Sequence, residues 1–250
     1  MKKSVLIISL LLFNIFPVSF INAESITVGY FLLEPHSSQK DGKHVGAIID
    51  YWRNYIAPKM RVDVKFVGPY PVPRLIKETT NGRVNVIALL AKNDERSNMM
   101  DYPNNPFVTG STGIAFLKNH RIKKIESVKE LNGLTLGFFA KGFIHPLLKN
   151  KMIKWHLTYT TKWQKRNLKM LNYERIDGLY NADINALVYN AHINNMKEKV
   201  NIFPIPGTET GLYSLFSKKD KGRYLKNYNQ IHPQVLEEVS YLDLVEKYMK

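Results

Sequence analysis

The sequence predicts a two-lobed α/β protein in which each lobe is a mostly parallel sheet flanked by helices. Short β-rich runs alternate with helical stretches, and the pattern restarts near the middle of the chain, which is typical of two α/β lobes of similar size. Two glycine-bearing extended segments, 107–117 and 203–217, are the natural crossings between the lobes. We therefore expect lobe 1 at 24–113 and 208–250, lobe 2 at 114–207, and a hinged clamp that closes on a ligand.

The elements of lobe 1 follow from strand alternation and helical spacing. Strands are predicted at 26–31, 62–67 and 84–90, and helices at 46–56 and 74–80. Pro58 is expected to end the first helix, because proline has no N–H to donate. The almost wholly apolar third run suits a strand that helices bury on both faces, as in a parallel sheet.

Lobe 2 repeats this alternation and then leads back to lobe 1. The predicted elements are a capped turn at 127–131, strands at 134–139, 157–160 and 177–180, helices at 143–149, 164–171 and 184–196, and extended segments at 202–206 and 211–217. The tail from 220 to 248 is expected to be helical, with an interruption near His232 and Pro233.

The N-terminus has the layout of a secretory signal peptide. Lys2 and Lys3 precede an apolar run at 5–16, and the small residue Ala23 marks the expected cleavage site of a signal peptide at 1–23. A membrane anchor is the alternative, but the run is well short of the ~20 residues that a spanning helix needs. The chain has no cysteine, which excludes disulfides and a lipid-modified cysteine. We expect an exported protein of the periplasm.

The chain is strongly basic. Its 250 residues carry a formal net charge of +15, and residues 24–250 carry 34 basic and 21 acidic side chains. A basic balance suits nucleic acid, an anionic membrane surface or acidic ligands, but the lysines are spread along the chain and mixed with apolar residues. A solvated lysine-rich surface is the simpler interpretation. Nucleic acid is also the wrong partner for the periplasm.

Short motifs along the whole mature chain carry a family resemblance. They are Ile26–Tyr30 with Pro35, Gly46–Asp50, Asn81–Ile87, Asp94–Arg96, Tyr102–Pro103, Pro106–Phe107, Ser127–Gly137 and Arg175–Gly178. In order and spacing they resemble the family 3 extracellular solute-binding proteins, best known for polar amino-acid uptake. The Pro73–Arg74 turn and the stretch 205–218 look more like an orphan, non-amino-acid branch of that family.

The resemblance implies a two-lobed fold of the type II periplasmic binding proteins and a non-enzymatic role. Such a protein clamps a small molecule between its lobes for an ABC-type permease, acts as a monomer and uses no cofactor. One alternative is an orphan binding protein that serves a membrane sensor. Another is a dehydratase-like enzyme, for which Glu34 or Asp183 would be the candidate acid or base.

Arg96 is the first candidate for ligand contact. It follows the third strand and matches the family arginine that clamps a ligand carboxylate, which a guanidinium binds through two parallel hydrogen bonds. The alternative is that Arg96 pairs with Asp94, Glu95 or Asp101 and holds its turn. The family's hydroxyl residues before this arginine are replaced by 88–93, Ala-Leu-Leu-Ala-Lys-Asn. We therefore expect a more apolar or aromatic ligand with an anionic group.

Eight further candidates lie at the carboxyl ends of strands or in the segments that follow them, where ligands of open α/β sheets bind. They are Tyr30, Phe31, Glu34, Tyr70, Arg74, Tyr180, Asn181 and Asp183. The first two and Tyr70 could stack on a ligand or simply pack. Glu34 could meet a cationic or hydroxyl group or be a solvated loop acid. Arg74 could contact a second anionic group or be a charge on a helix surface. The last three could face the ligand or cap the next helix. The seven histidines show no metal-ligand spacing, so no metal site is expected.

Overall fold

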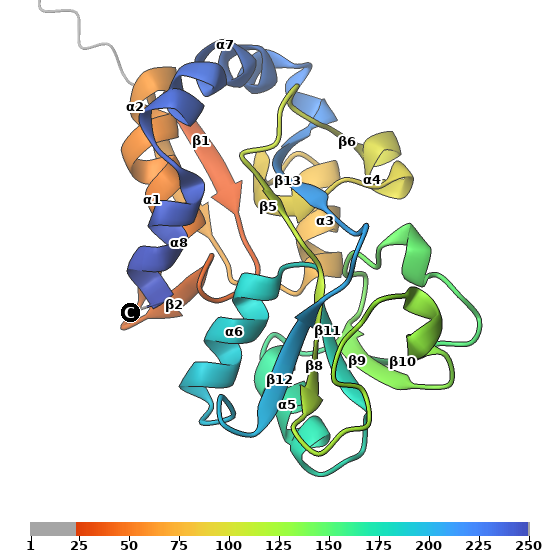
Figure 1. Ribbon diagram of the computed structural model, residues 1–250. Coiled ribbons are helices and arrows are strands. Elements are labelled where there is room, and N and C mark those ends of the chain that lie inside the picture. Colours follow the sequence, from red (N-terminus) through yellow and green to blue (C-terminus); the bar gives the residue numbers. More distant parts are fainter. Residues whose placement is uncertain (1–23, 250) are drawn as a thin grey trace, which may run out of the picture.

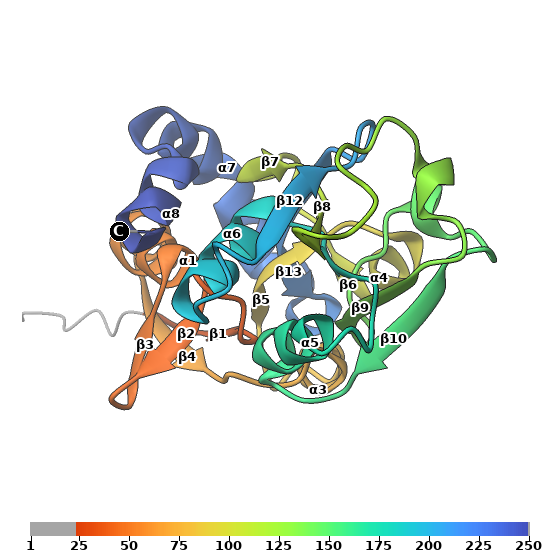
Figure 2. The same ribbon diagram turned by 60° about the horizontal axis from the view of Figure 1, so that its bottom comes forward.

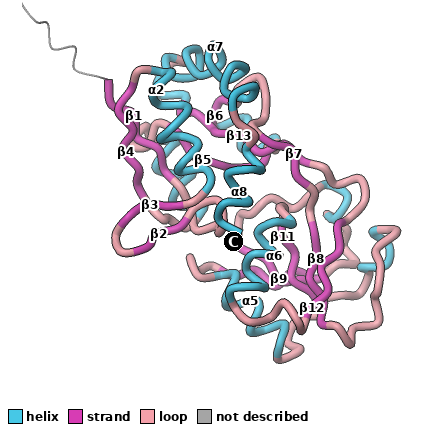
Figure 3. Tube along the Cα trace, turned by 60° about the vertical axis from the view of Figure 1, so that its left-hand side comes forward, coloured by secondary structure: helices cyan, strands magenta, loops and turns pink. Residues whose placement is uncertain are grey.

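The computed structural model describes residues 24–249. The signal peptide expected at 1–23 lies outside the described residues. Figure 1 shows two lobes, each built on its own sheet, with the chain passing from one to the other near β7, β8 and β13. Figure 3 shows the same two bodies from another side. No helix among the described residues is long and apolar enough to cross a membrane.

Lobe 1 is built on a sheet in the order β4-β1-β5-β13-β6, with β7 also paired to β13. Its strands are β1 (Glu24–Gly29), β4 (Val62–Val67), β5 (Val86–Ala91), β6 (Met100–Asp101), β7 (Val108–Gly110) and β13 (Thr210–Ser217), and a small hairpin joins β2 (Ser38–Lys40) to β3 (Lys43–Val45). The strands β4, β1 and β5 run parallel, and β13 returns antiparallel to β5. Every residue of β5 is buried, as its apolar sequence predicts.

The helices of lobe 1 pack on this sheet and on each other. They are α1 (Ala47–Tyr51), α2 (Ala57–Met60), α3 (Val72–Thr80), α4 (Asp94–Met99), α7 (Arg223–Glu238) and α8 (Tyr241–Met249), with a 3₁₀ turn at Lys218–Asp220. Trp52 is wholly buried at their centre. Its indole stacks on Tyr228 and donates a 3.0 Å hydrogen bond from Nε1 to Ser214 Oγ on β13. This bond ties the first helical segment to the central sheet.

Lobe 2 has a sheet in the order β10-β9-β11-β8-β12. Its elements are β8 (Gly113–Leu117), β9 (Thr135–Phe139), β10 (Lys154–Thr158), α5 (Trp163–Asn172), β11 (Gly178–Asn181), α6 (Ile184–Ile193) and β12 (Val200–Pro204), with 3₁₀ turns at Val128–Leu131 and Pro146–Leu148. The strands β10, β9 and β11 are parallel, whereas β8 and β12 are antiparallel to their neighbours. Each lobe therefore has three parallel strands and antiparallel crossing strands.

The two crossings lie side by side. Strand β7 pairs with β13 in lobe 1, and β8 pairs with β12 in lobe 2. Between them, the backbone N–H of Ile205 donates to the carbonyl of Thr112, and the hydroxyls of Thr112 and Thr208 are hydrogen-bonded. Both threonines are fully buried. The lobes are thus connected by two adjacent strands, the arrangement expected of a hinge.

Three sequence predictions of helix extent are wrong. The first helix does not end at Pro58, because a π-helical segment, Trp52–Ile56, shifts the hydrogen-bond register and the helix continues to Met60. The tail helix α7 runs through Pro233 and ends only at Glu238. The helix expected at 143–149 is a single 3₁₀ turn, Pro146–Leu148, because His145 before the proline is held out of the helical region with ψ at 140°.

Candidate functional site

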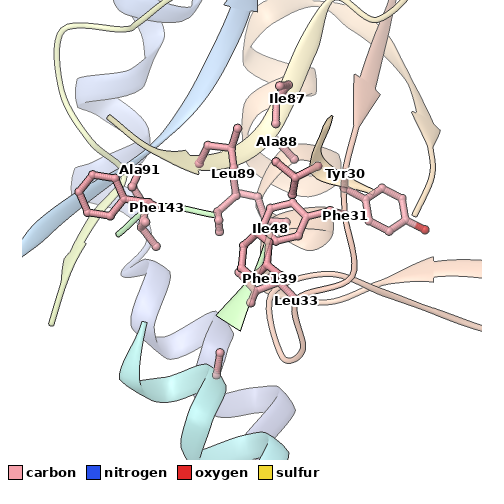
Figure 4. Close-up of a cluster of buried hydrophobic side chains, with 14 of the residues drawn as sticks. Tyr30, Phe31, Leu33, Ile48, Ile87, Ala88, Leu89, Ala91, Phe139 and Phe143 are labelled. Atoms are coloured by element: carbon pink, nitrogen blue, oxygen red, sulfur yellow. The ribbon is translucent and has the colours of Figure 1, made fainter. Parts of the chain in front are cut away.

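The cleft between the lobes is lined by the segments that follow parallel strands of both sheets. Phe31 comes two residues after β1 of lobe 1, and Phe139 ends β9 of lobe 2. Their ring centroids are 5.7 Å apart, so the two lobes touch through aromatic side chains. Figure 4 shows Phe31, Leu33, Leu89 and Phe139 converging on this contact. The lobes are closed on each other.

Closure leaves two small cavities in the cleft. One, of about 30 Å³, is lined by Phe31, Leu33, Leu89, Leu90, Ala91, Arg96, Phe138, Phe139, Phe143, Asn181, Ala182, Asp183 and Leu212. The other, of about 50 Å³, is lined by Phe31, Leu32, Tyr70, Pro71, Val72, Pro73, Phe139, Ala140, Thr158, Tyr159, Thr160, Thr161 and Trp163. Ligand pockets are usually about 300–1,000 Å³, so a ligand must separate these walls as it enters.

Arg96 lies at the cleft and joins the lobes. Its side chain is buried, and Nη1 donates a 2.7 Å hydrogen bond to the carbonyl of Ala91 at the end of β5. Nη2 donates a 2.9 Å bond across the cleft to the carbonyl of Lys141. Burial lowers the pKa of the guanidinium from its usual value. Asn93 caps α4 and fixes the helix that carries Arg96. Among the described residues, Arg96 forms no ion pair with a carboxylate.

Asp183 lies at the cleft and also caps a helix. Its carboxylate accepts hydrogen bonds from the backbone N–H groups of Asn185 and Ala186 at the start of α6. The same carboxylate lies 2.6 Å from Nε2 of His36 in lobe 1. The other ring nitrogen of His36 lies 2.8 Å from the hydroxyl of Tyr241 on α8. All three side chains are buried, so a polar group of lobe 2 is held by lobe 1 without access to water.

Two buried N–H donors of the cleft lining have no acceptor among residues 24–249. Asn181 accepts the backbone N–H of Asp183 through Oδ1, which leaves Nδ2 as its donor, and Nδ2 has no partner. Nε1 of Trp163 is likewise buried and unpaired. Each residue lines one of the two cavities. A buried donor without an acceptor costs about 1–3 kcal/mol, so both atoms favour a ligand that brings oxygen acceptors.

Of the predicted aromatic contacts, the structure brings Phe31 and Tyr70 to the cleft but not Tyr30. Tyr30 points away from the Phe31–Phe139 contact (Figure 4), and its hydroxyl lies 2.7 Å from Nδ1 of His44. Burial raises the pKa of Tyr30 to about 12. Successive residues of an extended segment face opposite ways, which explains why only one of this adjacent pair reaches the cleft.

Three polar or aromatic candidates also lie off the cavities. Oε1 of Glu34 accepts a 2.9 Å hydrogen bond from the hydroxyl of Ser38. The guanidinium of Arg74 lies over the ring of Tyr70, 4.5 Å from its centroid, and so reaches the rim only through that ring. Tyr180 is buried in the core of lobe 2, where its hydroxyl donates to the carbonyl of Phe143.

Sequence reasoning missed His36, Phe139 and Trp163. Phe139 was predicted only as the end of a strand. Trp163 follows the polar run 158–162, which comes at the carboxyl end of β10. The position of that run after a strand is the signal that could have identified Trp163. No local signal identifies His36, because Asp183 is 147 positions away along the chain. No group of three or more potential metal ligands lies together in the described part of the chain.

The comparisons with known proteins bear on the fold. No protein-family model and no curated protein sequence matches the chain significantly. An ancestral arginine-binding protein bound to arginine matches with a TM-score of 0.73 at 20% identity, covering 90% of this chain and 98% of that one. The GluR0 ligand-binding core of Nostoc punctiforme in complex with L-glutamate matches at 0.73 and 22%, covering 89% and 98%.

A third match is AbpA, an amino acid ABC transporter substrate-binding protein of Streptococcus pneumoniae bound to L-arginine. Its TM-score is 0.72 at 18% identity, and the match covers 90% of this chain and 94% of that one. At such identities the likeness establishes the fold. The chain has the two-lobed fold of type II periplasmic binding proteins, as the sequence predicted.

Proposed function

We propose that this chain is a periplasmic solute-binding protein whose lobes close on a small, largely apolar or aromatic molecule that carries an anionic or other oxygen-acceptor group. The observation that carries the proposal is the combination of aromatic cleft walls with unpaired buried donors at Asn181 and Trp163. In keeping with the sequence motifs, we place it in an orphan, non-amino-acid branch of the family 3 solute-binding proteins. Delivery to an ABC-type permease, a monomeric state and the absence of enzymatic activity are parts of the same proposal.

The aromatic cleft walls indicate that part of the ligand is apolar. Phe31, Phe139 and Phe143 are buried, and each lines a cavity between the lobes. When the lobes separate, these rings become exposed to water. A ligand that re-covers them recovers about 25 cal/mol for each Å² of apolar surface removed from water. A strongly polar ligand would not recover this free energy, because it has little apolar surface with which to cover the rings.

The unpaired buried donors of the cleft indicate that the ligand carries an acceptor group. Asn181 Nδ2 and Trp163 Nε1 are donors only, and Arg96 presents a third donor once lobe opening breaks its bond to the carbonyl of Lys141. A carboxylate that replaces that carbonyl would satisfy the guanidinium by a charge-assisted bond. The amino group of an α-amino acid would need acceptors, and Asp183 already accepts from His36 and the start of α6.

The proposal is tested by a thermal-shift screen of residues 24–250 against aromatic and aliphatic carboxylates, amino acids, polyamines and sugar acids. A ligand at 100 times its Kd adds about 2.7 kcal/mol of stability. For a chain of this size that corresponds to roughly 5–10 °C in Tm. We expect hits among aromatic or apolar carboxylates, and we expect Asn181→Asp and Trp163→Phe to weaken them.

The matched control is Tyr30→Phe, which removes a hydroxyl that points away from the cleft. It should leave the shift intact. If the hits are α-amino acids, or if they survive both cleft variants, the ligand class is wrong. If no ligand of any class shifts the Tm of the folded protein, the solute-binding role itself is refuted.

A second candidate function is a ligand-controlled module that reports to a membrane sensor. It is favoured by the bonds that the lobes make with each other: Arg96 to the carbonyl of Lys141, Asn190 Nδ2 to the carbonyl of Glu34 at 3.1 Å, and His36 to Asp183. These bonds stabilise closure by the protein's own groups, which suits a two-state switch more than a carrier. Small-angle X-ray scattering with and without a ligand separates the two. A carrier closes again on its ligand and stays compact, whereas a module that is closed at rest opens.

A further inference from the structure

The positive charge of the protein is concentrated in lobe 2. Residues 114–207 contain 16 basic and six acidic side chains, a net formal charge of +10, whereas 24–113 and 208–250 together contain 18 and 15, a net charge of +3. The stretch 131–173 holds eight basic residues and no acidic one. A single lobe therefore carries most of the electrostatic field of the molecule.

Five of these 16 basic residues lie on one surface around α5. Figure 2 shows the position of α5 on lobe 2. Two hollows of about 320 and 250 Å³ follow the helix, and both are lined by Lys165 and Lys169, so the surface is continuous. We call it the α5 face and define it by Lys162, Lys165, Arg166, Lys169, Tyr173 and Lys199, all of which are exposed.

The cations of the α5 face are not neutralised within the protein. Among residues 24–249, none of its five cations forms an ion pair with a carboxylate. Lys165, Arg166 and Lys169 in α5 and Lys162 at its N-cap are like charges three or four positions apart, and their repulsion costs stability. An external anionic surface that lies against the helix offsets this cost in stability.

Exposed aromatic side chains flank helix α5 in the chain, Tyr159 at the rim of a cleft cavity and Tyr173 on the α5 face. Tyr159, before the helix, is 78% exposed, and Tyr173, after it, is 68% exposed. Seven of the nine large hydrophobic side chains that are exposed in the described chain belong to lobe 2. A basic surface with exposed tyrosines on and beside it matches the interfacial region of a bilayer, where tyrosine rings lie at the level of the lipid headgroups.

We propose that the α5 face binds the surface of a membrane that contains anionic phospholipids. Lipid is favoured over an acidic protein because residues 131–173 place no acidic side chain among the cations of α5, and mixed charges are what fix the register of one protein partner. The inference does not rest on the identity of the cleft ligand, since no cation of the α5 face lines either cleft cavity.

The test is co-sedimentation of residues 24–250 with vesicles of mixed phosphatidylglycerol and phosphatidylcholine, at low and at physiological ionic strength. Omission of 1–23 prevents the apolar N-terminal run from contributing. We expect binding that weakens with salt and is lost on pure phosphatidylcholine vesicles. The quadruple variant Lys162→Gln, Lys165→Gln, Arg166→Gln and Lys169→Gln should bind at least ten-fold more weakly, because each basic residue near an anionic surface contributes a factor of about five.

The matched control replaces four exposed lysines of lobe 1, Lys40, Lys65, Lys77 and Lys226, by glutamine. It removes the same net charge but leaves the α5 face intact, so its binding should stay near that of the unmodified chain. Glutamine is a good helix former, and circular dichroism checks that both variants fold. Equal loss in the two variants, or no loss in the α5 variant, overturns the proposal. Binding to a polyglutamate peptide but not to the vesicles also overturns it and assigns the face to an acidic protein.

Discussion

The bond between His36 and Asp183 offers the sharpest test of how the lobes are held together. We predict that His36→Leu shifts the protein from the closed to an open arrangement. The bond is 2.6 Å long and is buried at both ends. A hydrogen bond to a charged group contributes about 1.5–3 kcal/mol, and only the closed form makes this one. A loss of about 2 kcal/mol changes the ratio of closed to open molecules roughly 30-fold.

The assay uses the absence of cysteine from the chain. Introduced cysteines at Lys77 on α3 and Lys154 on β10 would be the sole thiols, and both sites are exposed, one on each lobe. Nitroxide labels at these sites report the interlobe distance by double electron–electron resonance. In His36→Leu we expect a second, longer distance to appear.

Tyr241→Phe is the control for this experiment. It removes the other hydrogen bond of His36, but Tyr241 and His36 belong to the same lobe, so this bond survives lobe opening. The distance distribution of Tyr241→Phe should therefore match that of the unmodified protein. If His36→Leu also matches it, the bond to Asp183 does not hold the lobes together and the reasoning is refuted.

Three further predictions follow from other contacts. Arg96→Met should weaken closure by about 2 kcal/mol through the loss of the bond to the Lys141 carbonyl, measured by the same distances; an unchanged distribution would contradict it. Burial lowers the pKa of His232 to about 4, below the ~6.5 of an unfolded chain, so unfolding becomes easier as pH falls through this window. Denaturation curves should show a shallower pH dependence for His232→Phe, and equal slopes would refute this. Gly46→Ala should destabilise by about 3 kcal/mol, read from Tm, because φ is +124° and the new Cβ would overlap the His36 carbonyl; a near-neutral effect would contradict it.

The sheets could be predicted because their information is local. Strand β4 alternates in sequence and β5 is apolar throughout, so each pattern already states which faces are buried. Helix ends were predicted less well. Pro58 and Pro233 lie inside helices, because a π-helical segment precedes the first and α7 continues past the second. Tertiary packing of the helices outweighs the local cost of proline at these two sites.

The residues of the candidate site were also predictable from the sequence only in part. Loops that follow strands were recognisable, and Phe31, Tyr70, Arg96, Asn181 and Asp183 line or join the cleft. Tyr30, Glu34, Arg74 and Tyr180 come from the same strand ends and following segments but are directed elsewhere. Position in a loop does not determine side-chain direction, which depends on backbone dihedral angles and on neighbours that the local sequence does not reveal.

The sequence by itself determined the two-lobed α/β class, the order of its strands along the chain and the surplus of positive charge, because these depend on composition and on patterns within a few residues. Only the tertiary structure decided that His36 meets Asp183, that Phe31 meets Phe139, and that the cations of α5 share one face with the exposed Tyr173. Each of these contacts or surfaces joins residues from different elements. Their distances are set by how the sheets, helices and crossings pack, which no short stretch of sequence encodes.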